Sequence, residues 1–442
     1  MLTSIDLFAG AGGLSLGLEL AGFRTLLAIE YDPSAARTYE YNFPDAEIVC
    51  RDIREVSSSE IKKLLEDSAA SLDLVAGGPP CPGFSNMGRS KILSLVREGM
   101  WEGSEIRHQF IQDERNRLFM EFVRIVRDTK PRAFLLENVK GMRSSKVLDD
   151  DGNPLGIVDV ILDEFRNVGY SNTEMHAFDA ADYGVPQHRQ RVFFFGTLDG
   201  RETDLSPDIV RRRPTSMDAI SDLPAVSYDD GRAVTNKAAS SSNRYQRLMQ
   251  FGLYKDHERP DPSTGSPPQR KGELTCTTGR AVNQRDTHIF PLLQNSEDGT
   301  VVVYGDLDPD SIDFGPAWRY MPRKKKLVCR SKAKKNRPGT TEYKWYDPYK
   351  YPDKMRRIPP HRPSYTIVAH LAKDGYMFVH PNHDVHRTIT PREAARLQSF
   401  PDHFDFSAGG SVPMSEQFRQ IGNAVPPLLA MEIGKQIKEI LL

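Results

Sequence analysis

Short apolar runs alternate with helix-period stretches through the first half of this 442-residue chain, and this order constrains the fold more than any other feature. The apolar runs occupy residues 4–10, 24–30, 47–53, 72–78 and 132–139. Between them lie stretches with helical spacing, such as 115–126, in which Leu118, Phe119, Phe122, Val123 and Val126 share one face. Repeated strand–helix units predict an α/β fold with a Rossmann-like, doubly wound, mostly parallel sheet. The runs 172–180 and 190–198 are too close to hold a helix between them, which predicts a last antiparallel strand.

The regular pattern stops near residue 197 and returns near residue 387. Residues 197–386 hold many prolines and short apolar pieces, which predicts an inserted domain of irregular and β structure. A helix with Pro391 in its first turn is expected within 388–400, and residues 426–442 form an amphipathic helical pattern. We therefore expect one domain from 1–196 and 387–442, with the tail packed back on the first half.

The bulk composition excludes several classes of protein. Hydrophobic residues make up 38% and charged residues 27%, a balance typical of globular proteins. No apolar run approaches the ~20 residues of a membrane span, and no leader precedes the first strand, so a cytoplasmic location is expected. The cysteines Cys50, Cys81, Cys276 and Cys329 form no Cys-x-x-Cys pair, which argues against a disulfide framework and against a metal site.

A basic run stands out although the net charge is only −1. Residues 319–337 contain ten Lys or Arg and no acidic residue. Such a run is either a solvated loop or a patch that contacts phosphates. The sequence of the run alone leaves both readings open.

A glycine-rich turn, "DLFAGAGGLSLG" from Asp6 to Gly17, follows the first predicted strand and opens a helix. Gly10 and Gly12 fit the dinucleotide-binding pattern, but Ser15 holds its third position. Glu30 ends the second predicted strand, where an acidic residue can bind ribose hydroxyls. These features favour a nucleotide-like cofactor over ordinary strand-end turns. They do not separate NAD from S-adenosylmethionine.

The segment "GGPPCPGFS" holds Cys81 between prolines and glycines just beyond the fourth predicted strand. A single cysteine is often a small core residue, but here prolines fix the backbone and glycines leave room for a substrate. The next strand brings Glu137 to the same edge, and "QHRQRV" adds Arg189 and Arg191 on one face of a strand. The two arginines could stabilise a thiolate or bind substrate oxygens, or they could form a structural salt bridge.

Six segments in one order give the chain its resemblance to a known family. They are "DLFAGAGGLSLGLELAG", "GGPPCPGFS", "ENV", "QHRQR", "RTITPREAARLQSFPD" and "QIGNAVPP". The chain resembles the C5 cytosine-specific DNA methyltransferases of bacterial and phage restriction–modification systems. The motifs lie within 6–196 and 387–442, a little over half of the chain.

The resemblance implies roles for individual residues. Cys81 matches the nucleophile that adds to C6 of cytosine, and Glu137 matches the residue that bonds the N3 edge. Arg191 matches the arginine near the cytosine O2, with Arg189 beside it. S-adenosylmethionine is the implied methyl donor. The implied cofactor-binding residues are Phe8, Gly10, Gly12, Gly13, Glu30, Tyr31, Asp52, Ile53, Pro80, Leu118, Asn423 and Val425.

The resemblance also implies double-stranded DNA as the partner, with the target cytosine flipped out of the duplex. Residues 197–386 correspond to the family's target-recognition domain, which favours the phosphate-contacting reading of the basic run. The residues expected at DNA are Ser85, Gln187, Arg323, Lys324, Lys325, Lys326 and Arg330. A first motif at residue 6 leaves no regulatory N-terminal region, which is typical of bacterial or phage modification enzymes. We expect a monomer, and a separately encoded restriction endonuclease is compatible with this reading.

Two departures from the family pattern and three rival functions remain. Pro82 follows the nucleophile where glutamine is usual, and 86–112 form a longer loop than in many members. A tRNA cytosine methyltransferase on the same scaffold usually carries a Cys-Phe-Thr tripeptide, which this chain lacks. A catalytically silent DNA-binding relative would not need Cys81, Glu137 and Arg191 together. An NAD oxidoreductase would leave the proline-flanked cysteine without a purpose.

Overall fold

The structure is a computed structural model. It describes residues 1–67, 71–80, 118–144, 146–148, 154–251, 274–283, 285–294, 302–303, 306–307, 312, 318–321, 326–334, 337–344 and 354–442. No helix in these ranges combines the length and the apolar character needed to cross a bilayer.

A mostly parallel sheet forms the centre of the molecule, as the alternating pattern predicts. Within the described ranges its seven strands are β1 (Leu2–Leu7), β2 (Phe23–Ile29), β3 (Glu47–Val49), β4 (Leu74–Gly77), β5 (Ala133–Val139), β8 (Glu174–Asp179) and β9 (Gln190–Thr197). Their order is β3-β2-β1-β4-β5-β9-β8. Strand β9 is antiparallel to both of its neighbours, and the other pairs are parallel. The predicted fold class and the predicted last antiparallel strand are confirmed.

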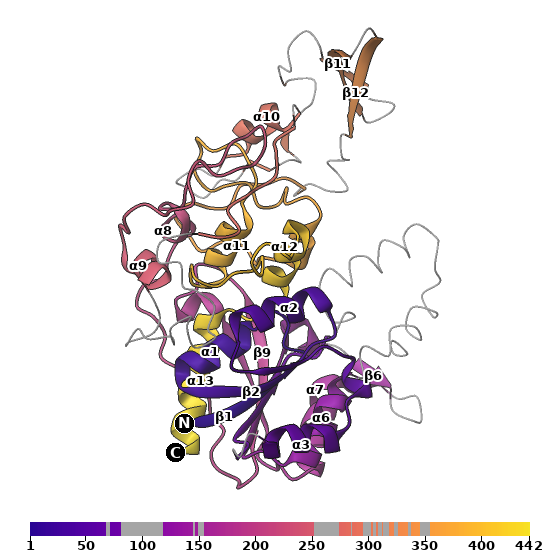
Figure 1. Ribbon diagram of the computed structural model, residues 1–442, viewed down its shortest axis with the longest axis vertical. Helices are drawn as coiled ribbons and strands as arrows, with labels where there is room; N and C mark the ends of the chain where they lie inside the picture. The colour runs from indigo at the N-terminus through magenta and orange to yellow at the C-terminus, as the bar shows by residue number, and fades with distance from the viewer. Residues whose placement is uncertain are drawn as a thin grey trace.

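Helices cover both faces of this sheet (Figure 1). Phe134 and Leu136 of β5 pack with α3 (Ser58–Asp67), α6 (Leu118–Thr129) and α7 (Ile157–Asn167). Phe193 and Phe195 of β9 point to the opposite core, which includes α1 (Gly13–Ala21), α2 (Pro33–Asn42) and α13 (Pro427–Leu441). Buried residues therefore run without interruption along these central strands, as expected for strands covered on both faces.

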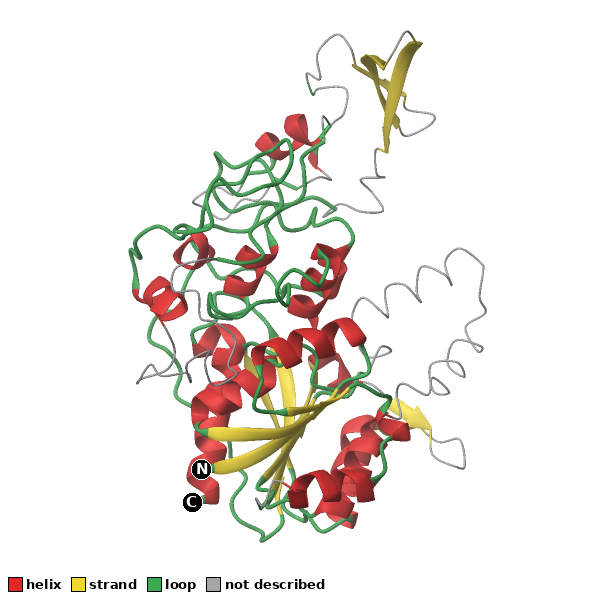
Figure 2. Cartoon of the chain, in the orientation of Figure 1, coloured by secondary structure: helices red, strands yellow, loops and turns green. Residues whose placement is uncertain are grey.

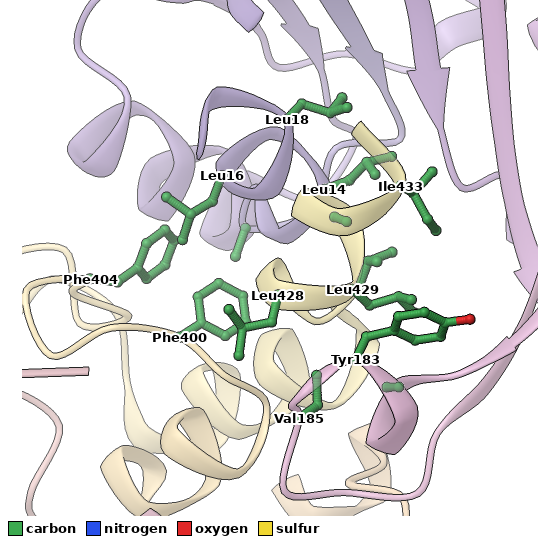
Figure 3. Packing of buried hydrophobic residues seen from close by; sticks show 14 of the residues in the cluster. Leu14, Leu16, Leu18, Tyr183, Val185, Phe400, Phe404, Leu428, Leu429 and Ile433 are labelled. Atoms are coloured by element: carbon green, nitrogen blue, oxygen red, sulfur yellow. The ribbon is translucent and has the colours of Figure 1, made fainter. Parts of the chain in front are cut away.

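The C-terminal helix completes the sheet's cover. Leu14 and Leu18 of α1 lie against α13, while Leu16 points toward Phe404 (Figure 3). The helices meet so closely that a Cβ added at Gly17 would lie 2.3 Å from the Cβ of Ala430. The two termini lie side by side (Figure 1). The expectation that the tail packs on the first half is confirmed.

Loops dominate the part of the chain between the two halves of this core (Figure 2). Its described elements are α8 (Ser216–Ile220), α9 (Arg244–Phe251), α10 (Asp286–Ile289), β10 (Trp318–Met321), β11 (Lys326–Lys334) and β12 (Arg337–Lys344). Strands β10, β11 and β12 form an antiparallel sheet that stands apart at one end of the molecule (Figure 1). A small pair, β6 (Lys146–Leu148) and β7 (Pro154–Gly156), borders the main sheet. Short 3-10 turns are η1 (Ile53–Glu55), η3 (Lys140–Ser144), η4 (Ala180–Tyr183), η6 (Phe290–Leu292) and η9 (Ala369–Ala372).

Two further helices, α11 (Pro391–Leu397) and α12 (Met414–Asn423), connect this region to the core. Helix α11 begins as predicted, with Pro391 in its first turn and a Thr390–Glu393 capping box. The buried Arg396 at its end donates to the Ala219 carbonyl at 2.9 Å and to Asp222 at 3.0 Å. Helix α11 is thereby bonded to α8 and the residues that follow it.

Candidate active site

The strand order reverses between β1 and β4, and this reversal marks the candidate site. The chain moves outward from β1 to β2 and β3, and then returns to place β4 on the other side of β1. In doubly wound sheets, ligands bind at such a reversal, at the carboxyl ends of the strands. Five of the residues that the sequence analysis selects lie at or just beyond the carboxyl ends of β1, β2, β3, β4 and β5: Phe8, Glu30, Asp52, Pro80 and Glu137.

The glycine-rich turn after β1 has the unusual backbone that a close ligand requires. Phe8, Gly10 and Gly12 all have positive φ angles, of 60°, 57° and 91°. A residue other than glycine in this region is strained, and such strain is concentrated at functional sites. A Cβ added at Gly10 would meet nothing within 4 Å, whereas one at Gly13 would lie 2.3 Å from the Val425 carbonyl oxygen. The turn thus faces open space at Gly10 and contacts the C-terminal motif at Gly13.

Glu30, at the end of β2, holds this turn in place. Its carboxylate accepts the N–H of Gly10 at 2.8 Å and the N–H of Asp32 at 2.7 Å. Burial raises the pKa of Glu30. Each carboxylate oxygen has a second lone pair, so Glu30 can still accept hydrogen bonds from a ligand's hydroxyls.

Tyr31 and Asp52 border the same edge. The Tyr31 side chain is 72% exposed, which is uncommon for a large aromatic residue. Asp52 accepts from the Arg54 Nε at 3.0 Å and Nη2 at 2.7 Å, and this hydrogen bonding lowers the pKa of Asp52. Ile53 is buried, Leu118 is half-buried at the start of α6, and Asn423 is exposed at the end of α12.

Asp6 is a buried acid beneath the turn that the sequence analysis did not select. Its Oδ2 accepts from the Ser15 Oγ at 2.5 Å, and Ser15 in turn accepts from the Tyr39 hydroxyl at 2.8 Å. Burial raises the pKa of Asp6 to about 7. The available signal was an acidic residue inside an otherwise apolar strand.

Glu137 and Arg191 meet at the carboxyl end of β5. The Arg191 Nε lies 2.7 Å from the Glu137 Oε1, and both side chains are 13% exposed. Burial lowers the pKa of Arg191. In the antiparallel register, Arg191 is opposite Val139, so Glu137 and Arg191 are diagonal neighbours on one face of the sheet.

The turn leading to Cys81 lies directly beside this pair. A Cβ added at Gly78 would lie 2.9 Å from the Glu137 Oε2, and the Asn138 Nδ2 donates to the Pro79 carbonyl at 3.3 Å. Pro80 is exposed at the end of the described stretch. Cys81, the next residue, lies outside the described residues.

Gln187 and Arg189 are enclosed rather than open to a ligand. Gln187 is fully buried and Arg189 is 1% exposed. The hydrogen bonds of both side chains run to residues of α11, α12 and the segment around Ile367. The hydrogen-bond partners of Arg189 thus differ from those of Arg191, although the two side chains are close enough to interact electrostatically.

Most of the residues expected at DNA lie outside the described residues. Ser85, Arg323, Lys324 and Lys325 lie outside the described residues, and Lys326 and Arg330 belong to β11. The β-ladders place Arg319, Lys326, Arg330 and Lys344 at positions on one face of the small sheet, with Glu342. The opposite face holds the uncharged positions Trp318, Tyr320, Leu327, Cys329 and Tyr343.

Residues 2–439 match the family model of the C-5 cytosine-specific DNA methylases. Among curated proteins, the type II methyltransferase M.AgeI of Thalassovita gelatinovora is 32% identical over 99% of both chains. The type II methyltransferase M.DdeI of Desulfomicrobium norvegicum is 32% identical over 98% of this chain and 88% of its own.

Solved structures share the fold. A protein described as a prophage-encoded DNA modification methyltransferase of E. coli superposes with a TM-score of 0.66 at 24% identity, over 100% of this chain and 99% of that one. The methyltransferase EhMeth of Entamoeba histolytica gives a TM-score of 0.54 at 13% identity, over 100% and 99%.

Proposed function

Because this chain belongs to the family of C-5 cytosine-specific DNA methylases, we propose that it methylates C5 of a cytosine flipped out of a specific duplex sequence. Cys81 is the nucleophile in this proposal, and Glu137 and Arg191 are its catalytic partners. The observation that carries the proposal is the Glu137–Arg191 ion pair beside the Gly78–Pro80 turn, which leads directly into Cys81. This arrangement supports the proposal because it puts an acid and a cation beside the turn that leads into the proposed nucleophile.

The proposed chemistry uses covalent catalysis. The Cys81 thiolate adds to C6 of the cytosine, while Glu137 holds a proton at N3 and so makes C6 electrophilic. Electron density then accumulates at C5, which accepts the methyl group. Loss of the C5 proton to a base and cleavage of the C6–S bond restore the aromatic ring. Arg191 orients Glu137 through the 2.7 Å contact and, in this proposal, also bonds the cytosine O2.

The residues at the strand reversal fit S-adenosylmethionine. This group would supply the methyl as an electrophile bound to a positively charged sulfur. Glu30 has lone pairs for ribose hydroxyls, and Phe8 and Tyr31 offer rings for the adenine. The open space at Gly10 leaves room for close approach to the backbone, while Gly12, Gly13, Asp52, Ile53, Pro80, Leu118, Asn423 and Val425 would complete the site.

We assign DNA recognition to residues 197–386. The separation of charge on the β10–β12 sheet supports this assignment. Lys326 lies opposite Lys344 in the ladder, so basic positions are paired on this face. Basic residues of a DNA-binding protein contact the anionic phosphates. We further propose that the protein acts in the cytoplasm as a monomer and protects DNA from a separately encoded restriction endonuclease, because its relatives are type II methyltransferases.

Bisulfite sequencing of DNA from cells that express the protein tests the reaction. We expect protected cytosines in one short sequence context, and no protection with Cys81→Ser. The matched control is Cys276→Ser, whose thiol packs 3.5 Å from Asp405, outside the proposed site. Protection by Cys81→Ser would remove the nucleophile assignment, and no protection by the intact protein would refute the proposed reaction.

A trapping experiment tests the covalent step separately. A duplex with 5-fluorocytosine at the target carries no C5 proton, so the adduct cannot collapse after methyl transfer. We expect a protein–DNA species that survives denaturing electrophoresis and requires both S-adenosylmethionine and Cys81. Methylation of the normal duplex without any trapped species would contradict the adduct.

A further inference from the structure

The inserted region is hydrogen-bonded to the strand that carries Arg191. The N–H of His188 donates to the Ser364 carbonyl at 2.9 Å, and the N–H of Ser364 donates to the Pro186 carbonyl at 2.8 Å. These bonds form a short parallel bridge just before β9 begins. The last part of 197–386 is therefore joined directly to the chain that enters the catalytic pair.

Two side chains from the segment that leads into β9 hold one residue of the insertion at both of its backbone polar groups. The Gln187 Oε1 accepts the N–H of Ile367 at 2.6 Å. The Arg189 Nη1 donates to the carbonyl of Ile367 at 2.8 Å. Gln187 and Arg189 alternate with Arg191 along the chain, so a shift at Ile367 acts on a stretch that ends in the catalytic pair.

The same two side chains also hold the ends of α11 and α12. The Arg189 Nη2 donates to the Gly422 carbonyl at 3.0 Å, and the Gln187 Nε2 donates to the Gln398 Oε1 at 2.6 Å. Gln398 donates onward to the Ile421 carbonyl at 2.7 Å. A cation at a helix C-terminus is favourable because it meets the unpaired carbonyls there. Helix α12 leads into the Asn423–Val425 turn of the proposed cofactor site.

Burial makes this junction rigid and specific. Buried hydrogen-bonding groups need partners within the protein, because water cannot reach them. Loss of one partner leaves the other with the full free-energy cost of its desolvation. Both ends of the Gln187 amide and both terminal nitrogens of Arg189 are bonded across segments far apart in sequence. The three segments can therefore move only together or by breaking buried bonds.

We propose that Gln187 and Arg189 are positioning residues. They couple the placement of residues 197–386 on DNA to the alignment of Glu137 and Arg191. The proposal rests on the proposed function, in which 197–386 binds the target sequence. Through these two residues, recognition of the target sequence controls the rate of methyl transfer. Neither residue contacts DNA or the cytosine in this proposal. A correctly seated insertion holds Ile367 in place, and the catalytic pair is then aligned.

The variant Gln187→Met tests the coupling, since it keeps the side-chain length but removes all three bonds of the amide. The control Thr366→Val removes the Oγ1 bond of Thr366 to the His188 carbonyl, in the same bridge but outside the buried junction. Single-turnover methylation is measured on the duplex found by bisulfite sequencing and on a duplex with one base pair changed. DNA affinity, S-adenosylmethionine affinity and the melting temperature are measured beside it.

We expect Gln187→Met to slow single-turnover methylation of the target at least tenfold and to shrink the rate ratio between the two duplexes. Both affinities should stay within about threefold of wild type, and Thr366→Val should retain its rate within twofold. Arg189→Lys should give an intermediate rate, since lysine keeps the charge but not both bonds. A folded Gln187→Met with unchanged rate and ratio would overturn the coupling, as would losses of affinity and melting temperature in proportion to rate. An inactive wild-type protein would instead refute the proposed function.

Discussion

Asp6 is an acidic residue buried in the apolar strand β1. It lies at the end of the central strand β1, is 1% exposed, and accepts a hydrogen bond from Ser15. Burial raises the pKa of Asp6 to about 7, and the nearby Glu30 carboxylate adds to this rise. Between the ordinary pKa of about 4 and the folded value, the native state holds a proton that the unfolded chain releases. Its contribution to stability is complete below about pH 4 and is lost as pH rises toward 7.

Replacement of Asp6 by asparagine should remove this pH dependence. Asparagine keeps an acceptor for the Ser15 hydroxyl but cannot ionise. We expect the free energy of unfolding of Asp6→Asn, relative to wild type, to rise between pH 5 and pH 8 by a few kcal/mol, since one pKa unit corresponds to ~1.4 kcal/mol. Urea unfolding of the protein without S-adenosylmethionine, at several pH values, measures it. The exposed Asp45→Asn is the control, and parallel profiles for wild type and Asp6→Asn would contradict the expectation.

The positions of Glu137 and Arg191 are predictable where one strand end decides them. Both lie at one edge of the sheet, 2.7 Å apart, while their catalytic roles stay predictions. The sequence does not show that Arg189 has partners different from those of Arg191, because Ile367 and Gly422 are far away in sequence. No local pattern records which carbonyls will surround a buried guanidinium.

Helices α1 and α13 depend on small residues for their close contact. A Cβ added at Gly17 would lie 2.3 Å from the Ala430 Cβ and 2.6 Å from the Pro427 carbonyl oxygen. Gly434 makes the reciprocal contact, since its added Cβ would lie 2.8 Å from the Ala21 Cβ. Backbone atoms at these distances cannot move without moving the helix, so the helix separation is set by the missing side chains.

Gly17→Ala should therefore destabilise the protein although alanine favours helices by about 1 kcal/mol over glycine. Overpacking of a tight contact costs roughly 1–3 kcal/mol, and here the clash includes backbone, so the net change should be a loss of ~1–2 kcal/mol. Urea unfolding followed by circular dichroism measures it. The exposed Glu439→Ala of α13 should change stability by less than about 0.5 kcal/mol. A Gly17→Ala protein more stable than wild type would show that the helices separate at little cost.

Most elements of the sheet domain were predictable, because each carries its own period. Helix α12 was not identified, although Met414, Phe418 and Ile421 recur at helical spacing. Its short apolar stripe lies in a stretch with prolines and glycines, which obscure the helical period. Its close contact was not predictable either: a Cβ at Gly422 would lie 2.2 Å from the Ala369 backbone nitrogen, across the junction between distant segments.

At the scale of the molecule, the fold brings basic residues together although the net charge is close to zero. The net charge is −1, yet the β10–β12 sheet gathers basic positions on one face at one end of the protein (Figure 1). The location of this sheet was not predictable, because a basic run has no period that fixes its place in a fold. The proposed DNA contact depends on that face.

Neutralisation of this face should reduce the salt dependence of DNA binding. Each phosphate contact contributes about 0.9 to the slope of log affinity against log salt concentration. We expect Lys326→Gln with Arg330→Gln to weaken binding at low salt and to reduce the slope by one to two, measured by fluorescence anisotropy on a duplex. Lys62→Gln with Lys63→Gln on α3 gives the same change in net charge away from the face and should keep the wild-type slope. Equal slopes for all three proteins would show that this face is solvated and does not contact DNA phosphates.

The packing of α13 on α1 has a consequence for synthesis. The face of α1 that includes Leu14 and Leu18 receives its cover from residues 427–441, which leave the ribosome only after the whole inserted region. At about 5–20 residues per second, that face waits on the order of 10–50 s after β9 has been made. An uncovered apolar surface of this kind is what chaperones bind and what drives aggregation. Slower translation of the inserted region would therefore lower the yield of folded protein, without any change in its sequence.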